Sequence, residues 1–383
     1  MKKLLFGIAL CGVSMAASAE EPLWMRDVRI SPDGTQVAFC YKGDIYSVSS
    51  NGGKAVRLTT HDSYESSPVW SPDGKKIAFA SDRYGNADVF VMSASGGAAT
   101  RLTFNSAAET PSAISPDGAY VYFSARIPEH DASALYPTTA MTELYRVPIG
   151  GGRTEQVLGT PAEMVSFAPD GQRFLYQDRK GFEDEWRKHH TSSVTRDIWL
   201  YDAATGKHVN LTGRAGEDRN PVFSADGKTV YFLSERDGGS MNVYSFPLDS
   251  PSSATRLSAF STHPVRFLSV SNDGTMCYAY DGAIYTQRQG GKASRLHIDV
   301  VRDDMDLPAK LRFTSGATSA GVSPDGEQVA FVVRGNVFVT SVEYGTTKQI
   351  TNTVESESDV VFGPDNRTLA YASERDGYWN INV

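Results

Sequence analysis

One tetrapeptide, Ser-Pro-Asp-Gly, recurs along the chain and constrains the fold more than any other feature. Exact copies begin at Ser31, Ser71, Ser115 and Ser323, and degenerate copies begin at Ala168, Ser224, Ser271 and Gly363. The intervals from each turn Asp to the next are 40, 44, 53, 56, 47, 52 and 40 residues. A turn that returns every 40 to 50 residues or so is typical of a β-propeller, in which each repeat forms one blade.

The second repeat shows why each unit should consist of four antiparallel strands. Turn residues separate four strand-like runs at 67–70, 76–80, 88–92 and 100–103. Proline presets φ in the first of these turns, and Asp-Gly permits the chain to reverse. The same order returns in the other units, whose outer strands end in similar residues: Val56-Arg57-Leu58-Thr59, Val209-Asn210-Leu211-Thr212, Thr255-Arg256-Leu257-Ser258 and Gln349-Ile350-Thr351.

Counting complete units predicts a six-bladed ring. The six units occupy about 23–60, 64–104, 108–159, 162–213, 218–258 and 264–299. Since each unit carries its own four strands, the ring, over 20–300, could close without exchanging a strand between its ends. Aromatic residues that recur in corresponding strands are expected to pack between blades: Phe39, Phe79, Tyr122 and Tyr231.

After the sixth unit the strand pattern lapses. We interpret 301–313 as a linker between two propellers; the alternative is a long loop within one larger ring. A seventh unit occupies about 314–351, and an eighth begins near 355 and reaches Val383 within its third strand. We therefore predict an all-β chain, with the first blades of a second, incomplete β-propeller over 314–383. An unpaired strand edge is poorly tolerated, so we expect the sequence to be the front portion of a longer protein.

The first residues have the pattern of a secretory signal peptide. A positive start at Met1-Lys2-Lys3 precedes a short apolar run, and Ala17-Ser18-Ala19 supplies the small residues that signal peptidase accepts. A permanent membrane span would need about 20 apolar residues. Lipidation of Cys11 is not favoured, because Leu10 stands where a small residue is expected. We predict cleavage of 1–19 and export to a bacterial periplasm.

Charge and cysteine content exclude some classes of protein. The chain has 45 acidic and 37 basic residues, a net charge of −8, which argues against nucleic-acid binding because phosphates require an excess of Lys and Arg. Only Cys40 and Cys277 remain after cleavage of the leader. Both lie in apolar strand-like runs, and two buried free thiols are favoured over a disulfide.

No motif for catalysis, cofactor binding or metal binding occurs. The sequence has no Gly-x-Ser-x-Gly elbow, no dinucleotide or Walker glycine motif and no His-Glu-x-x-His. Asp303, Asp304 and Asp306 lack the glycine and the terminal glutamate of a calcium loop, so a charged linker is favoured. The repeated turn Asp residues are predicted to be structural, since their side chains accept backbone hydrogen bonds two residues on.

One dense ionisable cluster interrupts the fourth unit: Trp186, Arg187, Lys188, His189 and His190. As a basic insertion it could hold the C-terminal carboxylate of a peptide by charge-assisted hydrogen bonds, with Trp186 as a stacking platform. The alternative is a solvated loop, or a contact with the next propeller. We predict these five residues as candidate peptide-binding residues.

The repeat resembles that of TolB-type propellers. The resemblance rests on the Ser-Pro-Asp-Gly turn, the hairpin Asp82-Arg83-Tyr84-Gly85-Asn86 and the Gly-Gly that precedes Arg-Leu-Thr. A narrower resemblance rests on the insertion at 185–199 together with a six-bladed ring that runs into a second propeller. In these respects the chain is similar to the tricorn-like serine peptidases of exported bacterial type.

That resemblance implies a function outside these residues. In the family, a six-bladed and a seven-bladed propeller precede a PDZ-like domain and a catalytic core with a Ser nucleophile and a His base. The propellers are thought to act as filters and channels for peptides. None of that core is present in the 383 residues, so we expect a substrate-gating scaffold that is inactive alone. Its expected partners are peptides or unfolded protein segments, with a homo-oligomer through the full-length parent.

Two other functions stay open. The chain could be a stand-alone periplasmic binding propeller of TolB type that works through protein partners. TolB itself carries a small α/β domain before its ring, whereas the repeats here begin almost at the expected mature start, which counts against a close match. It could also be the propeller of a prolyl-oligopeptidase-like enzyme, which would require Gly-x-Ser-x-Gly downstream.

Overall fold

The computed structural model describes residues 22–127, 141–182, 184, 186–187, 192–237, 240–300 and 313–383. The leader, most of the expected linker, and Lys188, His189 and His190 lie outside these residues. Within them the regular structure consists of strands and two 3-10 helices, which confirms the all-β prediction. No helix in this described part has the length and apolarity to cross a bilayer.

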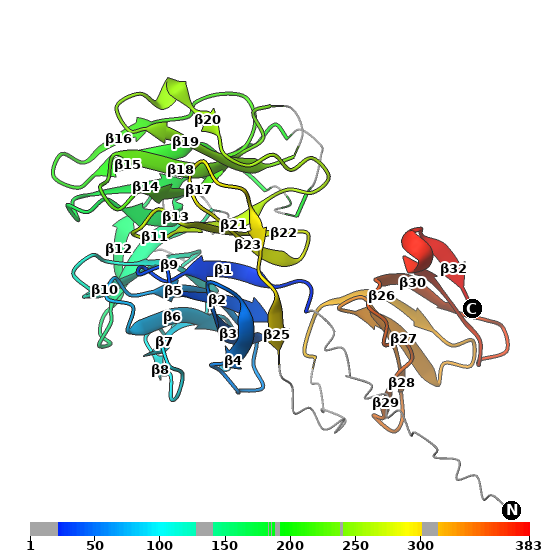
Figure 1. The fold of residues 1–383 in the computed structure, drawn as a ribbon. Coiled ribbons are helices and arrows are strands. Elements are labelled where there is room, and N and C mark those ends of the chain that lie inside the picture. The colour runs from blue at the N-terminus through cyan, green and yellow to red at the C-terminus, as the bar shows by residue number, and fades with distance from the viewer. Residues whose placement is uncertain are drawn as a thin grey trace, which may run out of the picture. The chain divides into compact units, whose positions relative to one another are not determined.

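The chain divides into two compact units, at 302/303. The first unit contains six sheets, which we call blades 1 to 6 (Figure 1). Blades 1 to 3 consist of β1 (Arg26–Ile30), β2 (Gln36–Tyr41), β3 (Asp44–Ser49), β4 (Gly53–Arg57), β5 (Glu65–Trp70), β6 (Lys76–Ser81), β7 (Asp88–Ser93), β8 (Thr100–Arg101), β9 (Glu109–Ile114), β10 (Tyr120–Ala125), β11 (Glu143–Pro148) and β12 (Glu155–Leu158).

Blades 4 to 6 follow the same order. They consist of β13 (Glu163–Phe167), β14 (Arg173–Gln177), β15 (Ile198–Asp202), β16 (Lys207–Asn210), β17 (Asp218–Phe223), β18 (Thr229–Ser234), β19 (Asn242–Pro247), η1 (Pro251–Ser253), β20 (Thr255–Arg256), β21 (Arg266–Val270), β22 (Met276–Tyr280), β23 (Ala283–Gln287) and β24 (Ser294–Arg295). The first strand of each blade contacts the first strand of the next, and β21 contacts β1. The six blades therefore form a closed ring, as predicted.

The Ser-Pro-Asp-Gly turn is a small hydrogen-bonded unit. In blade 1, Ser31 Oγ donates to Asp33 Oδ1 (2.5 Å) and accepts the N–H of Gln36 (3.0 Å). Asp33 also accepts the N–H of Thr35 (3.1 Å). These hydrogen bonds, that of Ser31 first, lower the pKa of Asp33. The predicted structural role of the turn Asp is confirmed, and the pattern repeats at Asp73, Asp117, Asp226 and Asp325.

The Arg-Leu-Thr ending fixes the short outer strand of a blade to its third strand. In blade 2, Thr103 Oγ1 accepts the N–H of Val89 (2.8 Å), and Arg101 forms an ion pair with Asp88 (2.8 Å). Leu102, between them, is fully buried. The hydroxyl contact recurs at Thr59, Thr212, Ser258 and Thr351. The two-residue strand β8 is thus held to β7 by side-chain contacts as well as by backbone hydrogen bonds.

The hydrophobic core lies between blades rather than inside them. One cluster joins Ala38 and Cys40 of blade 1 to Ile77 and Phe79 of blade 2, and the other blade pairs have equivalent clusters. The aromatic side chains predicted to pack between blades are buried in these clusters. Cys40 and Cys277 are buried free thiols in different clusters, as predicted.

Ring closure uses one strand that the sequence did not predict. β25 (Ile298–Val300), after blade 6, pairs in parallel with the outer strand β4 of blade 1. Each blade has its own four strands, as predicted, but closure adds a fifth strand to blade 1 from the other end of the ring, which the sequence did not indicate. The strand has only three residues and its partner lies about 245 residues earlier, so no local alternation marks it.

The second unit contains two further sheets. They consist of β26 (Ala317–Val322), β27 (Gln328–Val333), β28 (Asn336–Ser341), β29 (Thr347–Gln349), β30 (Glu357–Phe362), β31 (Leu369–Ser373), η2 (Arg375–Gly377) and β32 (Asn380–Asn382). The first sheet has four strands and the second has three. A separate core between them includes Val332, Val337 and Val360.

We expect Gly52→Ala to weaken ring closure. Gly52 has φ +85°, and an added Cβ would lie 2.6 Å from the carbonyl oxygen of His297, just before β25. The left-handed backbone costs an Ala about 1–2 kcal/mol, and the clash adds roughly 1–3 kcal/mol. Urea unfolding of the full chain should show a decrease in the free energy of unfolding that includes both costs.

The matched control is Gly74→Ala. Gly74 has φ +70° in a repeat turn and no atom within 4 Å of an added Cβ, so only the backbone cost of about 1–2 kcal/mol applies. Equal losses for the two variants would show that the contact of β25 with blade 1 does not stabilise the ring.

Candidate functional site

The two ends of the ring carry different features. Hairpins alternate between the ends of an antiparallel blade, so the Ser-Pro-Asp-Gly turns, which follow each first strand, all lie at one end. The insertion lies between β14 and β15, the second and third strands of blade 4, and its described residues therefore lie at the opposite end, where the first strands begin. We call this end the insertion face.

Arg187 of the insertion is buried in ion pairs. Its side chain is 5% exposed, and its guanidinium lies 2.9 Å from Glu235 and 3.3 Å from Glu217 of blade 5. Burial opposes the charge, but the hydrogen bond and charge of Glu235, then of Glu217, outweigh it and raise the pKa of Arg187. The arginine predicted to hold a peptide carboxylate is thus engaged by two carboxylates of this chain.

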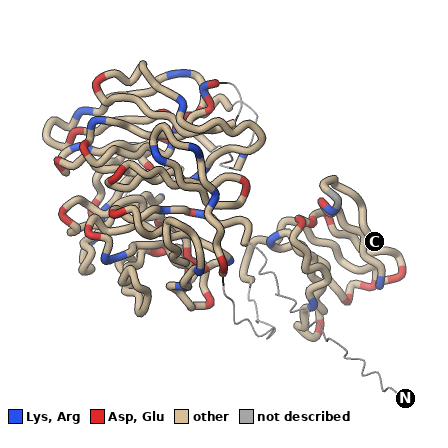
Figure 2. Tube along the Cα trace, viewed as in Figure 1, with Lys and Arg blue, Asp and Glu red and all other residues tan. Residues whose placement is uncertain are grey.

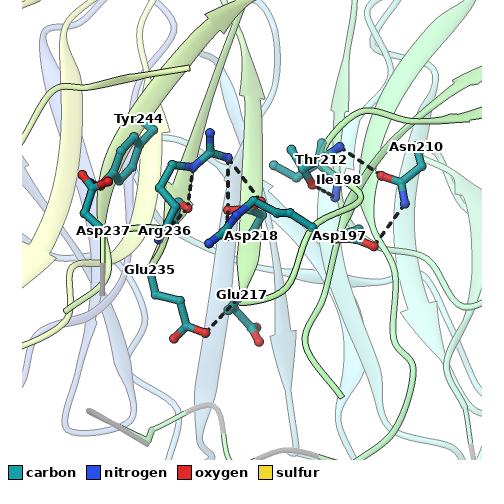
Figure 3. A network of polar contacts seen from close by, with 12 residues as sticks. Asp197, Ile198, Asn210, Thr212, Glu217, Asp218, Glu235, Arg236, Asp237 and Tyr244 are labelled. Atoms are coloured by element: carbon teal, nitrogen blue, oxygen red, sulfur yellow. Dashed lines mark hydrogen bonds and ion pairs between the residues drawn. The ribbon is translucent and has the colours of Figure 1, made fainter. Parts of the chain in front are cut away.

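A chain of charges continues from Glu217 into blade 4. Arg196 Nη1 lies 2.8 Å from Glu217, and both side chains are almost fully buried. Arg196 also lies 3.9 Å from Glu163, which pairs with Arg179 at 3.0 Å. Figure 3 shows Glu217 and Glu235, and beside them a further ion pair between Asp218 and Arg236 (3.2 Å). Buried charges of alternating sign thus hold the base of the insertion against blades 4 and 5.

Trp186 reaches from blade 4 to blades 1 and 6. The guanidinium carbons of Arg26 in blade 1 and Arg266 in blade 6 each lie 4.7 Å from the centre of its indole ring. Arg266 also donates hydrogen bonds to the carbonyl oxygens of Trp186 (2.9 Å) and Arg187 (3.2 Å). The Trp186 side chain packs edge-on against Phe267 and remains 44% exposed.

A cavity of about 590 Å³ opens beside Trp186, between blades 6 and 1. Trp24, Phe267 and Tyr280 form much of its apolar wall, and Arg26 and Arg266 supply positive charge. A concave, largely apolar site with a few charged groups is the usual form of a ligand pocket, and its volume is in the usual range.

A second cavity, of only about 50 Å³, shares Trp186, Arg266 and Phe267 with the first. Arg29 of blade 1 reaches Met164 of blade 4, which lines this second cavity (Nη2 to Sδ, 3.7 Å), and these blades are opposite one another in the ring. Burial lowers the pKa of Arg29. One contact between the described side chains, that of Arg29 with Met164, thus spans the ring from blade 1 to blade 4.

The five predicted peptide-binding residues fall into three groups in the structure. Trp186 borders the main cavity, Arg187 is buried in ion pairs, and Lys188, His189 and His190 lie outside the described residues. Acidic and basic residues are interspersed along the described chain (Figure 2). No group of three metal-ligating side chains occurs among the described residues.

Sequence reasoning missed the residues of blades 1, 5 and 6. Arg26, Arg219 and Arg266 each stand five positions before the first residue of the repeat turn, in units 1, 5 and 6. Arg26 and Arg266 border the main cavity and Arg219 the smaller one. Aligning the units on their turns would have shown that these arginines recur. It would not have shown that Trp186 contacts two of them, Arg26 and Arg266.

Comparison with known proteins finds similarity to peptidases. The family described as the tricorn protease N-terminal beta propeller domain matches residues 22–293. Dipeptidyl-peptidase 5 of Porphyromonas gingivalis is 29% identical, over 55% of this chain and 37% of that protein. Tricorn protease of Thermoplasma acidophilum is 27% identical, over 55% of this chain and 19% of that protein.

Among solved structures, a crystal structure of the tricorn protease superposes with a TM-score of 0.62 at 19% identity, covering 94% of this chain and 43% of that one. At this identity the likeness bears on the fold alone. The chain spans less than half the length of each of these three relatives.

We expect Arg187→Met to destabilise the first unit and release Trp186. Removing one partner of a buried ion pair leaves uncompensated carboxylates, here Glu217 and Glu235, and costs about 3 kcal/mol or more. Urea unfolding measures the loss, and increased acrylamide quenching of tryptophan fluorescence reports the release.

Arg288→Met is the matched control. Arg288 also pairs with an acid, Asp273 (3.3 Å), but its side chain is 78% exposed. Its replacement should change stability by less than about 0.5 kcal/mol. A similarly small effect of Arg187→Met would contradict an anchoring role for that residue.

Proposed function

The chain belongs to the tricorn protease N-terminal β-propeller family, and we propose that it forms the peptide-handling, non-catalytic propeller region of an exported tricorn-like serine peptidase. The observation that supports this most is the cavity beside Trp186, which is lined by aromatic side chains and by Arg26 and Arg266. Stacking and charge-assisted hydrogen bonds would hold an extended peptide there.

The proposal assigns bond cleavage to other parts of the parent peptidase. The chain covers 19% of the Thermoplasma tricorn protease, and a reaction needs a nucleophile and a base that no motif in this sequence supplies. No catalytic residue is assigned to it. Assembly of the parent into a homo-oligomer stays a prediction.

We propose domain boundaries on the same basis. The first ring occupies 20–300, the linker 301–313, and the start of a second propeller 314–383. The division into two compact units at 302/303 supports this arrangement, as does the two-sheet content of the second unit.

A second candidate is the propeller of a dipeptidyl-peptidase. The similarity to dipeptidyl-peptidase 5 of Porphyromonas gingivalis favours it, with 29% identity over 55% of this chain. Both candidates are propellers of peptidases, and both predict that this chain contacts peptides without cleaving them. A stand-alone binding propeller of TolB type would instead act through a folded protein partner.

We expect the full chain to bind a reduced and alkylated polypeptide without cleaving it. Binding is measured by fluorescence anisotropy of the labelled polypeptide, and cleavage by mass spectrometry after prolonged incubation. Cleavage that a serine-directed inhibitor abolishes would contradict the non-catalytic assignment. Absence of binding would contradict peptide handling, and the same polypeptide in its folded, disulfide-bonded form is the control.

We also propose that 1–19 is a signal peptide and that the chain works in the periplasm. The basic start, the apolar run and Ala17-Ser18-Ala19 support this. N-terminal sequencing of the protein from a periplasmic extract should begin at Glu20. Ala19→Leu should block cleavage, since the peptidase accepts a small residue there, and an uncleaved wild-type chain in the cytoplasm would contradict the proposal.

A further inference from the structure

We propose that Glu109 acts as a proton-dependent latch between blades 2 and 3. Its carboxyl group holds the two blades together while it is protonated and weakens their contact when it ionises. The inference concerns the stability of the ring at different pH values, so it goes beyond the proposed function and does not depend on it. It is supported by the burial of Glu109, by the shortage of positive charge around it, and by an arginine that the repeat supplies elsewhere but not here.

Glu109 is the first residue of β9, the inner strand of blade 3, and it contacts blade 2 through its backbone and its side chain. Its N–H donates to the carbonyl oxygen of Ala87 (2.8 Å), just before β7. Its Oε2 accepts a hydrogen bond from the hydroxyl group of Thr103. That hydroxyl group in turn accepts the N–H of Val89 (2.8 Å). Glu109 thus fastens β9 to the third strand of blade 2 and to the segment that follows its outer strand.

The Glu109 carboxyl group is in an environment that disfavours its charge. Glu109 is fully buried, and its Oε1 has no hydrogen-bond partner among the described residues. Burying a carboxylate without full compensation costs much more than burying the neutral acid. Burial raises the pKa of Glu109 to about 7, with the charge of Asp88 in support, while the hydrogen bond from Thr103 opposes the change. The neutral acid is therefore the form that fits this boundary.

Two buried carboxyl groups share one guanidinium group at the boundary. Asp88, at the start of β7, is also fully buried, and Arg101 of β8 lies 2.8 Å from it. Burial raises the pKa of Asp88 as well. One positive charge neutralises only one of two neighbouring carboxylates, so the other carboxyl group keeps its proton to a higher pH. Because Asp88 makes the ion pair with Arg101, the geometry assigns the proton to Glu109.

The other strands that pack against β9 add no cation for Glu109 in the described part of the chain. β10 contains no charged residue. On β5, Glu65 pairs with Arg83 (2.9 Å), and on β13, Glu163 pairs with Arg179 (3.0 Å). Lys76 of β6 is exposed and lies at the end of the ring that carries the repeat turns. Arg101 is therefore the cation that Asp88 and Glu109 have in common.

The repeat supplies an arginine to the equivalent acid of other blades. In three blades of the ring an acidic residue stands six positions before the first residue of the repeat turn: Glu65, Glu109 and Asp218. In blade 2, Glu65 pairs with Arg83, eighteen positions later. In blade 5, Asp218 pairs with Arg236 at the same spacing (Figure 3). In blade 3 that position is occupied by Ile127.

The arginine next to this position does not replace the missing one. Arg126 precedes Ile127, and its guanidinium carbon lies 5.4 Å from the centre of the Phe182 ring. Blade 3 thus has the acid of the repeat without the arginine that neutralises it in blades 2 and 5. This difference in sequence singles out Glu109 among the equivalent acids of the ring.

The latch has a definite dependence on pH. The pKa of Glu109 is about 7 in the folded ring, against an ordinary value of 4.5. Below pH 4.5 the carboxyl group is protonated in the folded and the unfolded chain, and the latch contributes fully. As the pH rises from 4.5 to about 7, the unfolded chain releases a proton that the folded ring keeps, so the free energy of unfolding falls. Above this range the boundary contains an ionised, unpaired carboxylate.

Glu109→Gln tests the latch, because it replaces the carboxyl group by an amide of similar size that cannot ionise. The unfolding equilibrium constants of the full chain and of this variant are measured by urea denaturation at about pH 5 and about pH 8. Between these pH values we expect the wild-type constant to rise, relative to that of the variant, at least about tenfold. A ratio of the two constants that is the same at both pH values overturns the proposal.

Ile127→Arg restores the arginine of blades 2 and 5 and should lower the pKa of Glu109. The wild-type change should then shrink to less than about threefold. A folded variant that keeps the full wild-type change contradicts the explanation from missing charge. Glu155→Gln is the matched control: Glu155 is a partly exposed acid of blade 3 paired with Arg146 (2.7 Å), and its replacement should leave the pH dependence as in the wild type.

Amide hydrogen exchange followed by mass spectrometry locates the effect and keeps the test decisive if Ile127→Arg does not fold. After correction for the intrinsic exchange rates, peptides that contain Val89 or Glu109 should lose protection in the wild type from about pH 5 to about pH 8, but not in Glu109→Gln. Peptides around Asp218, whose arginine is present, are the internal control. Loss of protection that is equal in all blades, or absent from the boundary of blades 2 and 3, overturns the proposal.

Discussion

Each blade of this protein has two apolar faces, and a blade can cover both only by packing against a neighbour on each side. The core clusters accordingly lie between blades, and six blades satisfy every face only when the sixth packs against the first. That last contact is the demanding one, because it joins segments about 240 residues apart. It is made by the pairing of β25 with β4, by core packing, and by Ser269, whose Oγ accepts the N–H of Ile30 (3.0 Å).

The junction of blades 6 and 1 is also where the candidate site lies. The strands there bring two arginines to one end of the ring, and the insertion from blade 4 reaches them with Trp186. The charge chain from Glu163 to Glu235 fixes the base of that insertion in blades 4 and 5. The site therefore depends on the whole ring, since its residues come from blades on both sides of the axis and converge only after closure.

The repeated features were predictable from the sequence because they arise locally. A turn Asp accepts hydrogen bonds from residues two or three positions away, and alternating aromatic residues specify the faces of a strand. The site was only partly predictable. A run of basic residues indicates a solvated loop, and burial of Arg187 requires Glu217 and Glu235 from the next blade. The three-residue β25 carries no periodic signal, and its parallel partner is remote in sequence.

Parallel pairing at β25 also determines how the ring responds to mechanical load. The chain leaves the first unit along the outer edge of blade 1, so tension on the residues that follow acts along β25. Such a force shears β25 against β4 and strains their hydrogen bonds together instead of opening them one at a time. Tension that would otherwise peel blade 6 from the ring is therefore borne first by blade 1.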